Sequence, residues 1–116
     1  MTVRPGVVRL ASPGDVRRLV SDHEVVVLHL DAGWDGYRAM MERKLMAYAA
    51  SDPDGVSFAY ADIDEYPDFA RSLGLVNVPA LAYYVAGDLA EVVMGLAQDV
   101  EANVARLRAT ARAAER

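Results

Sequence analysis

The sequence predicts a single α/β domain in which about four helices flank a central mixed sheet of about five strands. Two observations carry this prediction. Strand-like apolar stretches alternate with helical patterns along most of the 116 residues, which is typical of a sheet covered by helices on both faces. Near the end of the chain, only the tight turn Ala86-Gly87-Asp88 separates two strand-like stretches, which predicts an antiparallel hairpin. The expected order over residues 1–116 is therefore β-α-β-α-β-α-β-β-α.

The first half of the chain contains three expected strands and two expected helices. Ser12 and Pro13 are typical of a helix start, as the N-cap and the first helical residue. The continuous apolar run that begins at Val25 predicts a buried strand. The expected elements in this half are a strand over Gly6–Ala11, a helix from Pro13 to about Asp22, a strand over Val25–Leu30, a helix over about Gly36–Ala50 and a strand over Val56–Ile63.

The second half supplies the remaining helices and the closing hairpin. Pro67 favours the start of a short helix, and Gly74 marks its end. The last helix begins at about Asp99, because apolar residues from Val100 to Ala111 follow at helical spacing. The two strands of the hairpin are expected over Ala80–Val85 and Leu89–Met94.

Composition excludes several classes of function. The net charge is −5 and no cluster of Lys and Arg stands out, so we expect no binding to nucleic acid or to an anionic membrane. The first residues, MTVRPGVVRLASPG, lack the apolar segment of a signal peptide, and no apolar run has the length of a membrane span. We therefore expect a cytoplasmic protein. The absence of cysteine excludes a disulfide, a thiolate metal site and a dithiol cycle within these residues.

A run of acidic residues near the middle of the chain is the one candidate for a cation site. Its spacing lacks the glycine and the terminal glutamate of a calcium loop, so we expect a solvated loop and no metal or cofactor. The residues of this run are Asp62, Asp64, Glu65 and Asp68.

The segment Val25–Arg38, VVVLHLDAGWDGYR, joins a buried strand to a helix through a loop that presents a tryptophan. Backbone N–H groups point outward at such a helix start, and the helix dipole favours negative charge there. The segment resembles the active-site segment of thioredoxins, in which a buried strand is followed by Trp-Cys-Gly-Pro-Cys and a long helix. The matching residues are Trp34, Asp35, Gly36, Tyr37 and Arg38, so both cysteines are replaced.

The resemblance to thioredoxins extends from this segment to the end of the chain with little or no gapping. Asp62-Ile63-Asp64 matches Asn-Ile-Asp after the third strand, and Asn77-Val78-Pro79-Ala80-Leu81 matches Gly-Ile-Pro-Thr-Leu. Gly87-Asp88 and Gly95 match the hairpin and a glycine beside the substrate groove. The resemblance therefore implies the thioredoxin fold, with a cis bond before Pro79.

Three residues are candidates for chemistry near the replaced cysteines. Asp35 and Arg38 lie three positions apart at a helix start, where an ion pair is geometrically possible, although a solvated turn is the simpler interpretation. His29 lies in the buried strand, where thioredoxins have a buried Asp that helps proton transfer, and Tyr60 replaces a nearby Lys. His29 is expected to be buried near Asp35 or Tyr60, and a hydrogen bond to Tyr60 would satisfy it.

A second set of residues predicts a contact surface. Trp34 and Tyr37 suit such a surface because they are aromatic residues at a helix start. In thioredoxins the backbone before the cis-proline pairs with an extended peptide, so Val78 would present that backbone here. The expected patch comprises Trp34, Tyr37, Val78, Pro79, Gly95 and Leu96. Self-association through this patch is an alternative to a protein or peptide partner.

The resulting functional prediction is a redox-inactive, noncatalytic thioredoxin-like protein. It would bind a protein or peptide partner as a chaperone, scaffold or accessory subunit through this patch together with Asp35 and Arg38. Analogy with other cysteine-free members of the superfamily supports this prediction. The alternative is a small enzyme or small-molecule binder that uses Asp35, Arg38 and His29.

Overall fold

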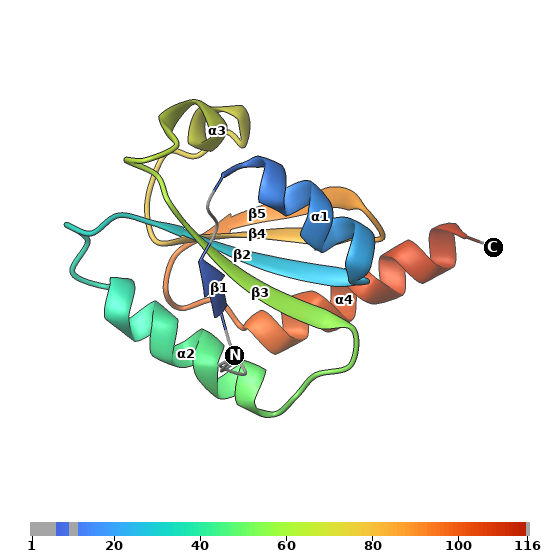
Figure 1. The fold of residues 1–116 in the computed structure, drawn as a ribbon. Helices are drawn as coiled ribbons and strands as arrows, with labels where there is room; N and C mark the ends of the chain where they lie inside the picture. Colours follow the sequence, from blue (N-terminus) through green and yellow to red (C-terminus); the bar gives the residue numbers. More distant parts are fainter. Residues whose placement is uncertain (1–6, 10–11, 116) are drawn as a thin grey trace, which may run out of the picture.

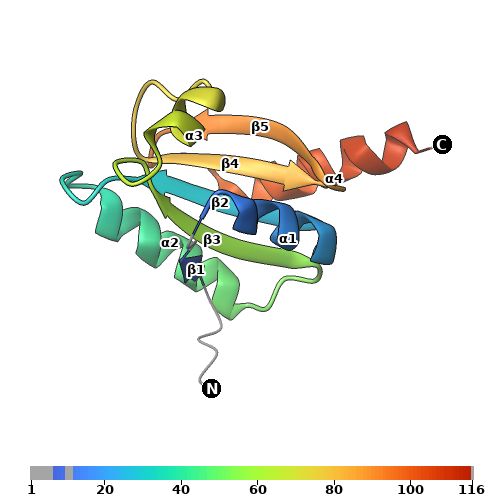
Figure 2. The same cartoon turned by 45° about the horizontal axis from the view of Figure 1, so that its top comes forward.

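The protein folds around one five-stranded sheet with helices on both faces, in the predicted order (Figures 1 and 2). The computed structural model describes residues 7–9 and 12–115. The elements are β1 (Val7–Arg9), α1 (Gly14–Asp22), β2 (Val25–Asp31), α2 (Arg38–Ala50), β3 (Val56–Asp62), α3 (Pro67–Ser72), β4 (Ala80–Val85), β5 (Asp88–Met94) and α4 (Val100–Ala114). This is the predicted thioredoxin-like fold.

β2 is the central strand of the sheet, whose order is β1-β3-β2-β4-β5. It pairs in parallel with β3 and antiparallel with β4, and β5 closes the sheet as the second strand of a hairpin. All seven residues of β2 are buried, as the continuous apolar run predicts for a strand with both faces covered. Because β2 and β4 run in opposite directions, Leu30 near the end of β2 pairs with Ala80 at the start of β4.

Side chains of β2 alternate between two hydrophobic cores, as expected for a strand. Val25 and Val27 pack with the apolar faces of α2 and α4. Val26, Leu28 and Leu30 pack with α1 and α3 on the opposite face. His29 and Asp31 belong to the first row and are the only buried polar or charged residues among those described. On the face of β2 that packs against α2, the side chains are therefore apolar at the start of the strand and polar at its end.

Local side-chain contacts move two helix starts from their predicted positions. α2 begins at Arg38 rather than Gly36, because the Tyr37 N–H donates to Asp35 Oδ1 (3.2 Å) in a turn before the helix. Ser12 does not act as the cap of α1; instead its N–H donates to the carboxylate of Asp15 (3.0 Å), and α1 begins at Gly14. Asp99 does cap α4, accepting from the Ala102 N–H at 3.0 Å.

Two predictions concern the ends of the chain and its relation to a membrane. The strand predicted over Gly6–Ala11 is present at Val7–Arg9, and the other residues of that prediction lie outside the described residues. Most of the N-terminal segment that was expected not to be a signal peptide also lies outside them. Within 12–115, no helix is both long enough and apolar enough to cross a membrane.

Candidate functional site around Trp34

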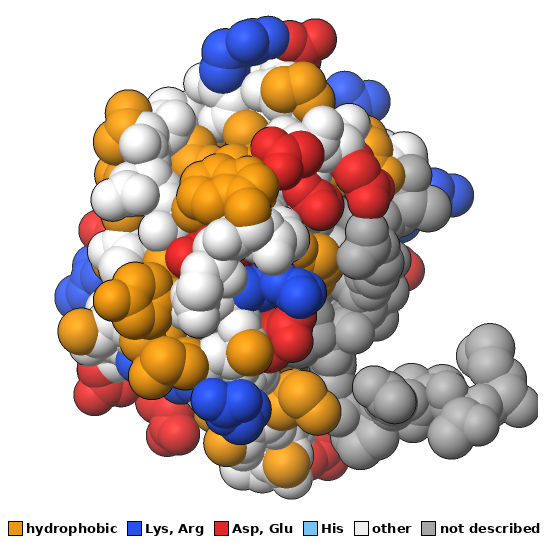
Figure 3. All heavy atoms as spheres, turned by 90° about the vertical axis from the view of Figure 1, so that its left-hand side faces the viewer, with side chains coloured by type: hydrophobic (Ala, Val, Ile, Leu, Met, Phe, Trp, Pro, Cys, Tyr) orange, Lys and Arg blue, Asp and Glu red, His pale blue; other side chains and the backbone are white. Residues whose placement is uncertain are grey.

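Three loops that are distant in sequence meet at one end of the sheet, as predicted. They follow β2, precede β4 and follow β5 (Figure 1). β4 starts beside the end of β2, and the Gly95 N–H donates to the Pro79 carbonyl at 2.8 Å, which ties the third loop to the second. The Val78–Pro79 bond is cis, as the resemblance implied. Figure 3 shows this end of the molecule, where hydrophobic side chains lie next to acidic and basic ones.

The members of the predicted patch differ widely in exposure. Trp34 and Tyr37 are exposed, at 69% and 58%. Val78, Gly95 and Leu96 are half-buried, whereas Pro79 is buried and offers no contact surface of its own. Sequence reasoning missed Val76, which is 84% exposed in the loop before β4. The sequence signal that could have identified Val76 is the presence of an apolar residue between Leu75 and the Asn77–Pro79 motif.

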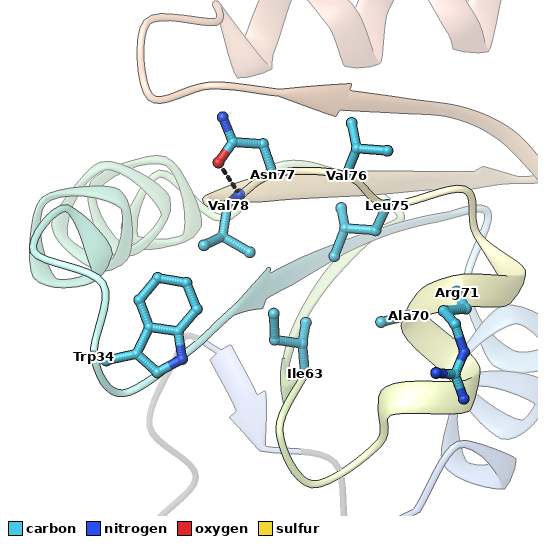
Figure 4. Close-up of a pocket in the computed structure, with 8 residues that line it drawn as sticks. All are labelled: Trp34, Ile63, Ala70, Arg71, Leu75, Val76, Asn77 and Val78. Carbon is cyan, nitrogen blue, oxygen red and sulfur yellow. Dashed lines mark hydrogen bonds between the residues drawn. The ribbon is translucent and has the colours of Figure 1, made fainter.

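A groove lies between Trp34 and α3 (Figure 4). The Trp34 Nε1–H donates to Asp64 Oδ2 at 3.0 Å, and the Asp64 N–H donates to Asp62 Oδ1 at 2.8 Å. Part of the acidic run therefore orients the indole. The groove has a volume of about 260 Å³ and is lined by Trp34, Ile63, Ala70, Arg71, Leu75, Val76, Asn77 and Val78.

The backbone of Val78 is less available to a peptide than predicted. Its N–H donates to the side-chain Oδ1 of the preceding Asn77 at 2.9 Å (Figure 4). A peptide that paired with this N–H would first have to displace the Asn77 side chain. The sequence prediction overlooked this competitor, although Asn is a residue that commonly bonds its neighbouring backbone.

His29 is fully buried, as predicted, but its hydrogen bond goes to Asp31 rather than to Tyr60. The His29 Nε2 and Asp31 Oδ2 atoms lie 2.8 Å apart, and both side chains have 0% exposure. Asp31 Oδ1 accepts from the Ala32 N–H at 2.9 Å. Tyr60 packs edge-on against the imidazole, with ring centroids 5.2 Å apart.

The carboxyl of Asp35 makes hydrogen-bonding contact with that of Asp31. Burial, followed by this hydrogen bond with Asp35, raises the pKa of Asp31 from 3.8 to about 7. Asp35 Oδ2 is buried. When both carboxyls are ionised, no donor group among the described residues gives this oxygen a hydrogen bond. A proton on Asp31, which the raised pKa of that residue favours, would supply that bond.

His29 stays neutral beside this carboxyl pair. Its burial, followed by the charge of Arg38, lowers the pKa of His29 from 6.5 to about 4. The spacing of Asp35 and Arg38 made an ion pair between them geometrically possible, but Arg38 Nη1 instead pairs with Glu42 Oε1 at 3.1 Å along α2. The site therefore holds a neutral imidazole and a carboxyl pair rather than an Asp–Arg pair.

Asp31 is the main residue that sequence reasoning missed. The strand was expected to end at Leu30, which placed Asp31 in the loop. The available signal was period-2 alternation, since a strand one residue longer puts Asp31 on the same face as His29. Among residues 7–9 and 12–115, no group of three or more His, Asp or Glu side chains is arranged to hold a metal ion.

Comparison with known proteins places this site in a family context. No family model matches the sequence. Thioredoxin H2 of Arabidopsis thaliana is 31% identical over 88 residues, which are 75% of this chain and 65% of that protein. Mitochondrial thioredoxin-3 of Saccharomyces cerevisiae is 27% identical over 89 residues, 77% of this chain and 69% of that protein. A variant thioredoxin from Halobacterium salinarum superimposes with a TM-score of 0.77 at 25% identity, covering 94% of both chains. The chain is therefore similar to thioredoxins and has the thioredoxin-like fold.

These comparisons correct the functional prediction made from the sequence. A noncatalytic role in binding a protein partner was inferred from the missing cysteines and from analogy with noncatalytic superfamily members. Both relatives are named thioredoxins, which are redox proteins, and so are structures that resemble this chain, including thioredoxin NaTrxh of Nicotiana alata. The prediction of a noncatalytic binding protein is therefore wrong, because the absence of cysteine does not establish such a role.

Proposed function

We propose that this protein acts in thiol–disulfide chemistry on sulfur atoms that its substrates supply. The observation that carries the proposal is the hydrogen-bonding contact between the carboxyls of Asp31 and Asp35 below the Trp34 loop, where superfamily members have reactive sulfur. The 116 residues contain no cysteine, so the chain itself does not cycle between a dithiol and a disulfide. Its contribution is acid–base catalysis of exchange between a substrate thiol and a second substrate's disulfide.

The proposed step conserves atoms and electrons. The Asp35 carboxylate takes the proton from a substrate thiol, and the resulting thiolate attacks one sulfur of the disulfide. A new S–S bond forms, the old one breaks, and the leaving thiolate takes the proton back from Asp35. A base is most effective when its pKa lies near the working pH, and Asp31, which contacts Asp35 directly, has a pKa raised to about 7.

Surrounding groups have distinct roles in this scheme. Asp35 is the catalytic residue, because it is the half-buried member of the pair, whereas Asp31 is fully buried. Asp31 and His29 are positioning residues that act through Asp35 from a fully buried location. A thiolate next to the start of α2 would be favoured by the helix dipole. The transfer also keeps the local charge constant, because Asp35 becomes neutral as the thiolate forms.

The Trp34 groove supplies a binding surface for the substrate. Its lining is largely apolar, and Trp34 is held at its rim by the hydrogen bond to Asp64. We propose that the substrate is a cysteine-bearing protein segment or peptide with an apolar residue near the cysteine. Tyr37 and Leu96, together with the half-buried Val78 and Gly95, border the same end of the sheet.

The test measures thiol–disulfide exchange between two peptides. One peptide carries a single cysteine next to a leucine, and the other carries a fluorescent mixed disulfide, so that exchange releases the fluorophore. A base of this kind contributes about 100-fold in rate. Catalytic amounts of the protein should accelerate exchange at pH 7, and Asp35→Asn should abolish the acceleration.

Asp54→Asn is the matched control, because Asp54 lies in the exposed turn between α2 and β3 and the variant loses the same charge. It should retain full activity. A folded wild-type protein that gives no acceleration above the uncatalysed rate would overturn the proposal. Equal activity of the Asp35→Asn and Asp54→Asn variants would also overturn it.

A further inference from the structure

A second groove lies at the opposite end of the sheet, between the β4–β5 hairpin and the C-terminal half of α4. It has a volume of about 540 Å³ and is lined by Val85, Ala86, Asp88, Ala90, Leu107, Thr110, Ala111, Ala114 and Glu115. Figure 2 shows α4 passing behind β4 and β5 and continuing past the end of the sheet. β5 runs from this groove towards the Trp34 site, and its seven residues span about 20 Å, so the two sites are separate.

Shape and apolar character make this groove suitable for a peptide. Val85 and Leu107 are almost fully buried and form its apolar floor. Both walls carry small side chains, Ala86 and Ala90 on the hairpin side and Ala114 on the helix side, so a partner's backbone can approach closely. A volume of this size is within the usual range for ligand sites, roughly 300–1,000 Å³.

The charges at the groove indicate what occupies it. Its only charged lining residues are Asp88 on the hairpin and Glu115 at the end of α4, and both are exposed. Neither forms an ion pair with another described residue. The arginines of α4 have other acidic partners, because Arg106 pairs with Glu91 at 2.6 Å and Arg108 with Glu24 at 2.9 Å.

Arg112 of α4 also pairs with Glu24, at 3.3 Å. None of these arginines therefore pairs with the two carboxylates at the groove. The net charge of −5 would further favour association with a positively charged partner.

We propose that this groove binds a peptide segment with a short apolar centre and a Lys or Arg at each end. The apolar residues cover Val85 and Leu107, and the two cations contact Asp88 and Glu115 on opposite walls. This binding does not depend on the chemistry proposed for the Trp34 site, so either proposal can fail without the other.

The probe is a short fluorescent peptide with Lys at both ends and Leu and Ala between them. Its binding is followed by fluorescence anisotropy, and its location by amide chemical-shift changes in the full chain. We expect saturable binding, with shifts at the hairpin and the second half of α4 rather than in the Trp34 loop. Replacing the peptide's Lys residues by Glu should abolish the binding.

Two variants of the groove test the contacts separately. The double reversal Asp88→Lys with Glu115→Lys should weaken binding about tenfold or more, because it replaces attraction by repulsion. Ala90→Trp, which fills the groove from an exposed position, should do the same without a change of charge. The control is Asp22→Lys with Glu101→Lys, which changes the net charge equally at exposed positions outside the groove.

Three results would overturn the proposal. The first is that the wild-type protein does not bind the Lys-flanked peptide, or binds it in the Trp34 loop. The second is that the groove variants, shown to be folded by circular dichroism, bind as tightly as the control. The third is that butylammonium, a simple apolar cation, binds the groove as tightly as the peptide, since the site would then accept a small cation rather than a peptide segment.

Discussion

The two faces of β2 show how one strand serves both stability and chemistry. Towards α1 and α3 it presents Leu28 and Leu30, with at most 1% exposure, in a wholly apolar core. Towards α2 it presents His29 and Asp31 at the same end of the strand, and these are equally buried. Buried ionisable groups contribute little to stability compared with apolar residues of similar size. The polar row is therefore best explained by a role other than packing, and its position below the Trp34 loop agrees with the chemistry proposed there.

The largest expected effect belongs to the apolar face. Leu28→Ala removes a fully buried side chain from a packed core and should lower the free energy of unfolding by about 3 kcal/mol. Urea unfolding at several pH values measures it. The loss should be the same at each pH, because Leu28 does not titrate. A loss that varied strongly with pH would show that the two faces of β2 are coupled.

The polar face should instead change how stability depends on pH. His29 has a pKa of about 4 in the folded protein, below its usual 6.5, so the unfolded state binds the proton more readily between these values. This group alone makes stability rise as the pH rises from about 4 to 6.5. Asp31 has a raised pKa of about 7, so it makes stability fall as the pH rises from about 4 to 7. In the wild-type protein the two trends oppose each other.

Replacing Asp31 should expose the contribution of His29. The Asp31→Asn variant is expected to become more stable as the pH rises from about 4 to 6.5. The slope for one proton is at most about 1.4 kcal/mol per pH unit. The measurement is urea unfolding across this range beside the wild-type protein. A variant curve parallel to that of the wild type would contradict the raised pKa of Asp31.

Replacing His29 should have the opposite effect. His29→Leu leaves Asp31 as the buried titrating group, so this variant is expected to lose stability as the pH rises from about 4 to 7. The same unfolding experiment measures it, and Leu28→Ala provides a comparison that shifts the curve without tilting it. If His29→Leu leaves the acid limb of the curve unchanged, the imidazole does not titrate as a buried neutral group.

Much of the fold could be predicted from the sequence because its signals are local and repeated. The continuous apolar run of β2 and the helical spacing in α4 each involve several residues, so errors at one position do not change the result. The ends of elements were less predictable, since single hydrogen bonds decide them. The contact between Tyr37 and Asp35 delays the start of α2, and the contact between Ser12 and Asp15 does the same for α1.

The candidate site was only partly predictable, because its decisive contacts join groups whose orientation the sequence does not give. His29 was identified, but its partner Asp31 lies one residue beyond the expected end of the strand. The pairing of Arg38 with Glu42 rather than Asp35 depends on where α2 begins. The hydrogen bond from the Val78 N–H to the Asn77 side chain competes with pairing to a peptide, and a comparison of motifs does not reveal it.

A smaller effect is expected where Trp34 meets Asp64. Asp64→Ala removes the acceptor of the indole N–H and should cost about 1 kcal/mol or less, because both groups are at the surface. Trp34 is the only tryptophan, so its fluorescence anisotropy reports directly on the loss of this contact. We expect faster indole motion in this variant. Asp68→Ala, in the same acidic run but paired with Arg71, should leave the anisotropy unchanged.

The smallest expected effect is the absence of any disulfide reduction by the protein alone. Reducing an insulin disulfide requires two electrons, and a chain without cysteine has no dithiol to supply them. Insulin mixed with the protein should therefore stay soluble, as in a boiled control. With glutathione added, two glutathione molecules supply the electrons and leave as their own disulfide, and the protein should accelerate this reaction through Asp35. Reduction without added thiol would show a reductant in the chain that acid–base catalysis cannot explain. If glutathione reduced insulin at the same rate with and without the protein, the buried carboxyl pair would have no role in thiol chemistry.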